Sequence, residues 1–330
     1  MFLSSFPLRR SAPILLLLLS CLSALGQTEE SIRYAITQPA NASLTLEGTL
    51  TLPDGATKPV PVVLLIAGSG PTDRDCNSAT GLKSDAFKML ADSLAQQGVA
   101  VARYDKRGSG KNLFLAANVL KPQEHRFDFY VSDAIGFIRQ LQADKRFSGV
   151  FVAGHSEGSL VGMLAARQTN ANGFISLAGA GRNIADVMKE QGRRLGNPAD
   201  VQADVDAALD SLKQGYPVHP RNPLLKSQLS PAAQPGLISW MKYDPATELS
   251  AYPKPVLIVQ GRKDLQVSVA DAERLKAANA AARLLLFDDM NHILKNVART
   301  SQTDNFKTYN NPTLPLTPGL ATAIAQFVKQ

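Results

Sequence analysis

The segment Gly154-His155-Ser156-Glu157-Gly158 has the composition of a tight turn that presents a reactive serine. The apolar run 149–153 before it favours a strand, and the alanine- and leucine-rich stretch after it favours a helix. Where a strand turns abruptly into a helix, backbone atoms come close together, and glycine fits there because it has no Cβ. The Ser156 hydroxyl would then lie at a helix N-terminus, where the helix dipole favours developing negative charge. We therefore predict that Ser156 is a nucleophile.

A serine hydroxyl is a weak nucleophile, so it needs a general base close to it. The sequence contains four histidines, and His292 follows the apolar run 284–287. This position comes last in the order serine, acid, histidine that accompanies a strand–serine–helix turn. His155 is better explained by packing beside the serine, and His125 and His219 lie in loop or inserted sequence. His292 is the candidate base.

The base in turn needs a carboxylate that orients its ring. Asp264 ends a short loop after the apolar run 255–259, so we expect it at the same sheet edge as Ser156. Its rivals are Asp244, in inserted sequence, and Asp288 and Asp289, which are too close in sequence to His292 to approach it in the usual way. We predict Asp264 as the acid; the alternative is a structural loop carboxylate.

The oxyanion formed in acyl transfer needs two preorganised hydrogen-bond donors. One should be the backbone N–H of Glu157, the residue after the nucleophile. The second should come from the loop Ala67-Gly68-Ser69-Gly70-Pro71, whose small residues let the backbone approach a substrate. We choose the N–H of Ser69, with Gly70 as the alternative donor and a plain strand-end turn as the alternative explanation of the loop.

Apolar runs alternate with amphipathic segments through most of the chain, which indicates an α/β fold with a mostly parallel sheet flanked by helices. The strands expected are 43–52, 62–66, 99–103, 149–153, 174–178, 255–259 and 284–287. The run 62–66 is rich in β-branched residues and has no polar interruption, as expected of a central strand buried on both faces.

The alternation of strands and helices stops between about Gly181 and Tyr252, where prolines break up short helical stretches; among them are Pro198, Pro217, Pro220, Pro223, Pro231 and Pro235. We interpret residues 181–252 as a helical insertion. The core then consists of two parts, residues 27–180 and 253–330.

The first 26 residues have the composition of a secretory signal peptide, because Arg9 and Arg10 precede an apolar run from Ala12 to Leu19 and small residues follow. The run is too short to span a bilayer, so we expect an exported protein, periplasmic or secreted, without a membrane span. A competing interpretation is a lipobox ending at Cys21, which would become a lipid anchor. Cleavage after Gly26 would leave Cys76 as a single cysteine, which has no catalytic signature around it.

The formal net charge is +7, from 35 basic and 28 acidic residues. Arg9 and Arg10 fall in the leader, so without the leader the chain has 33 basic and 28 acidic residues. The basic residues are scattered and not interleaved with aromatics, which argues against nucleic acid as a partner. The histidines and cysteines show no metal-ligand spacing, so we expect no metal, and the chemistry outlined above needs no cofactor.

The chain resembles the bacterial α/β-hydrolases of the serine-aminopeptidase-like group, which includes esterases and uncharacterised hydrolases. The resemblance runs from about residue 43 to the end and is most specific at Gly68–Asp75, Arg103–Gly110, Gly154–Ser159 and Met290–His292. It implies Ser156, Asp264 and His292 as a triad and residues 181–252 as a cap over the pocket. The chain departs from many relatives at Ala67, where they have a histidine.

Three side chains are candidates for substrate binding. Arg74 could grip a substrate carboxylate or form a structural salt bridge. Trp240 and Tyr243 could form an apolar wall of the pocket or anchor the insertion to the core. The Glu157 side chain could repel anionic substrates or pair locally.

The leading hypothesis is a serine hydrolase that cleaves a carboxylic ester of a small molecule through an acyl-enzyme. An amidase or aminopeptidase is the second, because acidic residues of the insertion could bind a substrate amine; these are Glu190, Asp200, Asp204, Asp206, Asp210 and Glu248. A non-catalytic binding protein on the same fold is the third.

Overall fold

The computed structural model describes residues 27–40, 43–113 and 119–330. The expected signal peptide, residues 1–26, and the possible lipid anchor at Cys21 lie outside the described residues.

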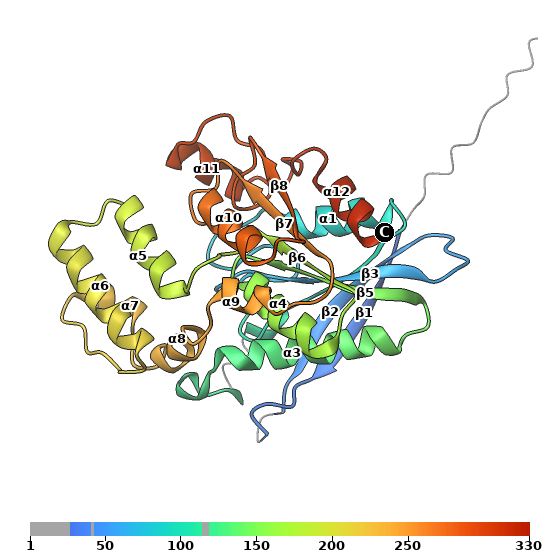
Figure 1. The fold of residues 1–330 in the computed structure, drawn as a ribbon. Coiled ribbons are helices and arrows are strands. Elements are labelled where there is room, and N and C mark those ends of the chain that lie inside the picture. Colours follow the sequence, from blue (N-terminus) through green and yellow to red (C-terminus); the bar gives the residue numbers. More distant parts are fainter. Residues whose placement is uncertain (1–26, 41–42, 114–118) are drawn as a thin grey trace, which may run out of the picture.

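An eight-stranded sheet forms the centre of the molecule, in the order β1-β2-β4-β3-β5-β6-β7-β8 (Figure 1). β1 and β2 pair antiparallel, β2 pairs antiparallel with β4, and all pairs from β4 to β8 are parallel. The strands are β1 Gln27–Ala35, β2 Thr45–Pro53, β3 Val60–Ile66, β4 Ala100–Tyr104, β5 Phe147–His155, β6 Gly173–Leu177, β7 Val256–Gly261 and β8 Arg283–Phe287. The parallel strands therefore end at one common edge.

The strand β1 was missed, because we expected the sheet to open at residue 43. Its sequence, Gln-Thr-Glu-Glu-Ser-Ile-Arg-Tyr-Ala, is mostly polar and exposed, since β1 lies at an edge of the sheet and pairs on one side with β2. An edge strand of this kind does not need the apolar alternation by which strands are recognised in a sequence.

Helices cover both faces of the sheet, and each face has its own apolar core. α3 (Phe127–Ala143), α4 (Glu157–Thr169), α9 (Pro245–Ser250) and α10 (Val269–Ala278) pack on one face. α1 (Ala86–Ala95) and α12 (Leu320–Val328) pack on the other. α11 (Gln302–Tyr309) lies in the connection that leads from β8 to α12.

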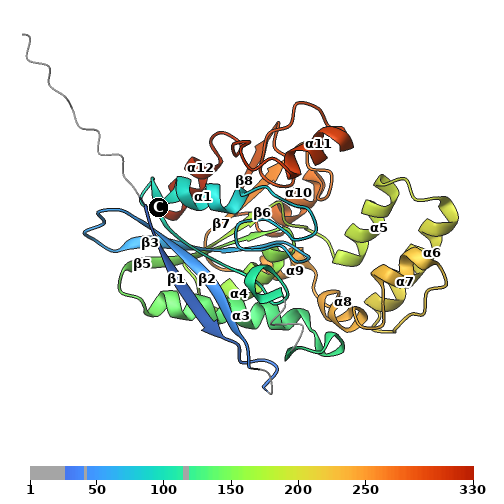
Figure 2. The ribbon, with the colours of Figure 1, turned by 180° about the vertical axis from the view of Figure 1, so that it is seen from behind.

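Five helices occupy the sequence between β6 and β7, within the segment where we expected a helical insertion. They are α5 (Ile184–Arg194), α6 (Ala199–Lys213), α7 (Pro223–Gln228), α8 (Gln234–Trp240) and α9. α5 to α8 project from one side of the sheet in both views (Figures 1 and 2). They have a small core of their own, built around Leu209, Leu212, Leu225, Leu229 and Met241.

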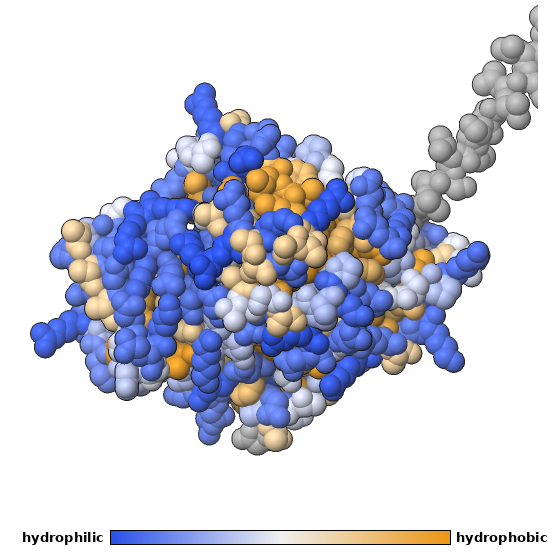
Figure 3. Space-filling model, viewed as in Figure 1, coloured by the Kyte–Doolittle hydropathy of each residue, from blue (hydrophilic) through white to orange (hydrophobic). Residues whose placement is uncertain are grey.

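The surface is mostly hydrophilic in the view of Figure 3, with an apolar patch in the region where Figure 1 places β7 and β8. β8 forms the second edge of the sheet, and Leu284, Leu285 and Leu286 in it are only partly buried. Over the described ranges, no helix has both the length and the apolar character needed to cross a bilayer.

Candidate active site

Ser156 lies at the sharp turn between β5 and α4 and has a strained backbone, with φ 54° and ψ −121°. A non-glycine residue adopts such a conformation only where its surroundings enforce it. Here the turn is enforced by packing: a Cβ at Gly154 would lie 2.0 Å from the Gly158 carbonyl oxygen, and one at Gly158 would lie 2.4 Å from the Ile66 carbonyl oxygen. The Ser156 N–H donates to Leu177 O of β6 at 3.0 Å. The two glycines thus let β5, α4 and the loop after β3 meet around the serine.

Asp264 and His292 are brought together, with 2.8 Å between Asp264 Oδ2 and His292 Nδ1. Both side chains are buried, at 0% exposure for Asp264 and 5% for His292. The other carboxylate oxygen, Oδ1, accepts the N–H groups of Gln266 at 2.7 Å and Val267 at 3.0 Å. These bonds fix the carboxylate in the loop after β7, at the sheet edge where the Ser156 turn also lies.

The charge state of Asp264 follows from these contacts. Burial raises the pKa of its carboxyl. His292 and the N–H groups of Val267 and Gln266 lower this pKa by more than burial raises it, so the net pKa lies below its usual value. An ionised Asp264 accepts a hydrogen bond, so Nδ1 of His292 must carry the proton. That leaves Nε2 of His292 with the free lone pair that a general base needs.

The three rival carboxylates are engaged elsewhere. Asp244 caps α9 through the N–H of Thr247 and lies 3.3 Å from Arg274. Asp288 pairs with Arg262 and Asp289 pairs with Lys263.

His155, the residue before Ser156, contacts both the main chain and the ring of His292. Its Nε2 lies 2.7 Å from the main-chain oxygen of His292, and its ring packs 4.7 Å from the His292 ring and 5.5 Å from that of Phe87. Burial lowers the pKa of His155 to about 3, so its ring is neutral at ordinary pH. Because its partner is a carbonyl, Nε2 is the donor.

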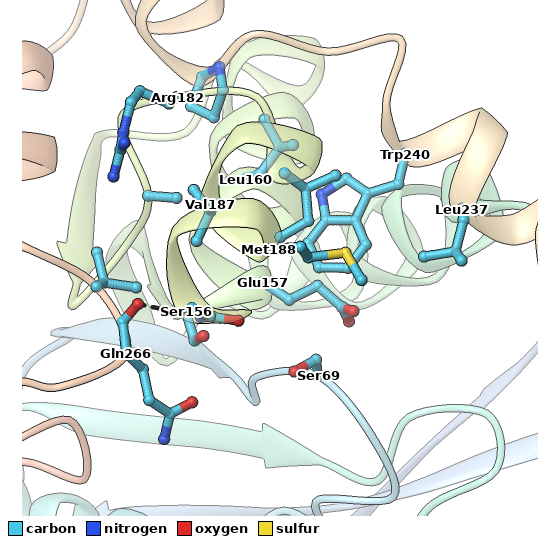
Figure 4. Close-up of a pocket in the computed structure, with 15 residues that line it drawn as sticks. Ser69, Ser156, Glu157, Leu160, Arg182, Val187, Met188, Leu237, Trp240 and Gln266 are labelled. Atoms are coloured by element: carbon cyan, nitrogen blue, oxygen red, sulfur yellow. Dashed lines mark hydrogen bonds between the residues drawn. The ribbon is translucent and has the colours of Figure 1, made fainter. Parts of the chain in front are cut away.

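A cavity of about 280 Å³ opens above Ser156. Figure 4 shows Trp240, Met188 and Leu237, from the inserted helices, across from Ser69, Ser156 and Glu157, from the ends of the strands. Its apolar lining consists mainly of Leu160, Ile184, Val187, Met188, Leu237 and Trp240. Among the described residues that line it, Glu157 is the only carboxylate.

Both predicted oxyanion donors border this cavity. Glu157 is the first residue of α4, so its N–H has no intrahelical acceptor. Ser69 follows Gly68, where a Cβ would lie 3.1 Å from the Ser156 Cβ. The Glu157 side chain forms an ion pair with Lys106, with 2.8 Å between Oε1 and Nζ.

Two of the three predicted substrate-binding side chains are placed elsewhere. Arg74 is buried and bound to Asp105: its main-chain N–H donates to Oδ1 at 2.9 Å, and its Nη2 donates to Oδ2 at 2.7 Å. It does not line the cavity. Tyr243 donates its hydroxyl to Asp128 and packs 5.8 Å from the Phe127 ring, also outside the cavity. Trp240 lines the cavity and stacks on Phe127 at 5.5 Å. For Arg74 and Tyr243 the structure therefore favours the salt-bridge and anchoring alternatives.

Sequence reasoning missed four polar residues beside the site: Gln191, Gln266, Arg182 and Lys106. Gln191 Nε2 donates to Gln266 O at 3.0 Å, and both residues also line a second cavity of about 650 Å³ between α5 and α11. Arg182 lines the first cavity but is held by Asp271 at 2.7 Å and by Glu190 at 2.5 Å. The sequence holds no local signal for these residues, because their partners lie on other elements. Within the described part of the chain, no three histidine, cysteine or acidic side chains gather as metal ligands would.

Comparisons with known proteins indicate the family and the fold of the chain. The sequence model of a family described as "Serine aminopeptidase, S33" matches residues 80–296. The esterase EstD of Thermotoga maritima is 28% identical over 259 residues, which cover 76% of this chain and 58% of that protein. The chain therefore spans little more than half the length of that relative.

Solved structures show the same fold at low identity. Est1E of Butyrivibrio proteoclasticus with bound ferulic acid has a TM-score of 0.55 at 16% identity, covering 86% of this chain and 93% of that one. The Pyrococcus furiosus esterase Pf2001 has a TM-score of 0.52 at 15% identity, covering 91% and 90%.

Proposed function

Because this chain belongs to the serine aminopeptidase S33 family of hydrolases and has the α/β-hydrolase fold that its sequence predicted, we propose that it hydrolyses carboxylic esters. Ser156 is the nucleophile, His292 the general base and Asp264 the carboxylate that orients it. The observation that carries the proposal is the 2.8 Å contact of His292 Nδ1 with Asp264, held at the sheet edge that also presents Ser156. The esterase names of EstD, Est1E and Pf2001 are consistent with it.

In the first half of the reaction, Ser156 Oγ attacks the ester carbonyl carbon while His292 Nε2 takes its proton. Asp264 stabilises the imidazolium that results. The negative charge on the former carbonyl oxygen is received by the N–H groups of Ser69 and Glu157. His292 then gives the proton to the leaving alcohol oxygen, and the acyl group remains on Ser156.

In the second half, water attacks the acyl-Ser156 carbonyl, and His292 takes a proton from that water. The tetrahedral intermediate collapses as His292 returns the proton to Ser156 Oγ. The products are a carboxylic acid and free enzyme, and no cofactor is consumed in either half.

The lining of the cavity favours an uncharged, short acyl group. The volume of about 280 Å³ lies at the lower end of ligand pockets, and most of the side chains that line it are apolar. Its two charged side chains, Arg182 and Glu157, are both neutralised by partners of opposite charge. A charged acyl group would find no free counterion there.

An aminopeptidase would need a carboxylate that is free to bind the substrate amine. The acidic residues first considered for this role point elsewhere: Glu190 pairs with Arg182 and Arg194, Asp206 with Arg193, Asp210 with Lys189 and Glu248 with Arg167. None of the six lines the cavity. The ester is therefore preferred over the aminoacyl amide.

We also propose that residues 181–252 act as a cap, because Trp240, Met188 and Leu237 of this segment face Ser156 across the cavity. Export through the leader 1–26, with or without a lipid on Cys21, remains a proposal from the sequence. N-terminal sequencing and mass measurement of the protein isolated from its own host would distinguish cleavage after Gly26 from lipidation at Cys21.

Turnover of p-nitrophenyl acetate, butyrate and decanoate by the purified protein tests the esterase proposal. We expect the short esters to be the better substrates and Ser156→Ala to abolish turnover, while Ser250→Ala, at the exposed end of α9, retains it. Preferred cleavage of aminoacyl coumarin amides would favour the aminopeptidase. Absence of turnover together with no fluorophosphonate labelling of Ser156 would favour a binding protein.

A further inference from the structure

We propose that Lys106 is a positioning residue that sets the oxyanion hole, by holding the two segments that carry its N–H donors. This inference rests on the proposed function. It assigns a role to a residue of the segment Arg103–Gly110 for which the sequence indicated no function of its own.

Lys106 lies in the loop after β4 and is one of the most deeply buried charged residues described, at 1% exposure. Its Nζ donates to the main-chain oxygen of Gly68 and, at 2.8 Å, to Oε1 of Glu157. Nζ also lies 4.9 Å from the centre of the Tyr130 ring, a cation–π distance. A buried ammonium is tolerated only where such partners replace water.

The contact with Gly68 determines where the Ser69 N–H points. The Gly68 carbonyl and the Ser69 N–H belong to one planar peptide unit, which is trans. In a trans peptide the C=O and N–H point in opposite directions, so a cation that holds the oxygen on one side directs the N–H to the other. The ammonium also polarises the peptide, which makes the N–H a stronger donor.

The contact with Glu157 anchors the other donor. Glu157 begins α4, so its side chain and its N–H are attached to the same first residue of the helix. Lys106 thereby ties the start of α4 to the loop after β3. The sheet order explains how one side chain reaches both: β3 lies between β4 and β5, so the loops that follow these three strands are consecutive along one edge.

The first test is Lys106→Met, which keeps the length of the apolar stem and removes the ammonium. With p-nitrophenyl butyrate we expect kcat to fall by about 10- to 100-fold, while KM changes by less than about threefold. This loss does not exceed the fall in kcat of about 10²- to 10³-fold that follows removal of one whole oxyanion donor. The affinity for a butyl trifluoromethyl ketone, whose serine adduct carries an oxyanion, should fall by the same factor as kcat. A structural role alone would not link these two losses.

A second variant addresses the carboxylate that Lys106→Met leaves buried without its partner. In Lys106→Met/Glu157→Gln both charges are gone, so we expect this protein to fold at least as well as the single variant and to remain impaired in kcat and in ketone affinity. Wild-type kcat in the double variant would overturn the proposal, because the defect would then come from the orphaned carboxylate. An unchanged ketone affinity beside a lowered kcat would overturn it as well.

Asp133→Asn is the matched control. Asp133 forms a buried ion pair with Arg107, which follows Lys106 in the loop after β4, with 2.6 Å between Arg107 Nε and Asp133 Oδ2. The hydrogen bonds of its carboxylate go to Arg107 and not to Gly68 or Glu157. We expect it to lower the melting temperature but to leave both kcat and the ketone affinity as in wild type; an equal loss of the two would contradict a specific role of Lys106. Failure of the wild-type protein to hydrolyse any ester would instead refute the proposed function.

Discussion

His155 Nε2 donates a hydrogen bond of 2.7 Å to the main-chain oxygen of His292. This bond joins the residue before the proposed nucleophile to the proposed base. Since Nε2 holds the proton, the other ring nitrogen of His155, Nδ1, is an acceptor; it is buried and has no hydrogen-bond partner. Protonation of the ring would place an uncompensated charge beside His292.

The burial of His155 predicts a loss of stability in acid. In the unfolded chain this ring binds a proton near pH 6.5, whereas in the folded protein its pKa is lowered to about 3 by burial. Between these values the unfolded state binds more protons, so the free energy of unfolding falls as the pH falls, by up to about 1.4 kcal/mol per pH unit from this residue. Urea unfolding from pH 7 down to pH 4.5 measures this slope.

His155→Gln serves as the reference for that measurement, because glutamine can still donate to the His292 oxygen but does not titrate. We expect the stability difference between wild type and variant to shift in favour of the variant as the pH falls. A difference that stays constant between pH 7 and pH 4.5 would contradict the burial of a neutral ring.

Asp264→Asn should lower kcat by about 10⁴-fold and leave the protein folded. The amide group of asparagine can donate to His292 Nδ1, which favours the tautomer with a proton on Nε2 and so removes the free lone pair. The rate of labelling by a fluorophosphonate should fall with kcat. Asp288→Asn, at a carboxylate that is largely exposed and paired with Arg262, is the control and should retain activity.

Gly158→Ala should destabilise the protein by about 3 kcal/mol or more. The added Cβ would meet the carbonyl oxygens of Ile66 at 2.4 Å and Ala67 at 2.6 Å, which are backbone atoms and cannot move aside alone. Gly149→Ala is the comparison, because its Cβ would meet the side chain of Asn172 at 3.0 Å. Thermal unfolding of both variants tests this, and equal melting temperatures would argue against a sterically enforced turn.

Gln191→Ala should widen the range of acyl chains accepted. Gln191 and Gln266 border both cavities and are joined by a hydrogen bond. We therefore expect a shorter side chain at position 191 to open the cavity of about 280 Å³ above Ser156 into the cavity of about 650 Å³ between α5 and α11. Since each buried CH₂ contributes about 0.8 kcal/mol, kcat/KM for an octanoate relative to a butyrate ester should rise by about tenfold or more. Gln214→Ala, at the exposed end of α6, should leave the ratio unchanged.

The placement of Ser156, Asp264 and His292 at the ends of strands could be predicted because each lies in a segment that follows an apolar run. A short apolar run rich in β-branched residues and bounded by turn residues indicates a buried strand, and the carboxyl ends of parallel strands meet at one edge. The capping box Ser268–Asp271 at the start of α10 is a pattern of the same kind, because its two members lie three residues apart. These are local patterns, which a sequence displays within a few residues.

The contacts of Arg74, Tyr243 and Lys106 could not be predicted in this way. Arg74 meets Asp105 and Tyr243 meets Asp128, partners 31 and 115 residues away. The role proposed for Lys106 depends on β3 lying between β4 and β5, an order that the sequence alone does not reveal. Side chains with long-range partners become interpretable only once the sheet order is known.

The helices α5 to α9 leave the sheet after β6 and return to it at β7, and these two strands are neighbours that pair directly. The pairing of β6 with β7 therefore does not depend on how the intervening segment is folded. In evolution, this segment can lengthen, shorten or exchange its apolar residues while the strands that carry Ser156 and Asp264 keep their register. A change in the proposed cap can therefore alter the substrate accepted without moving the residues proposed to break the ester bond.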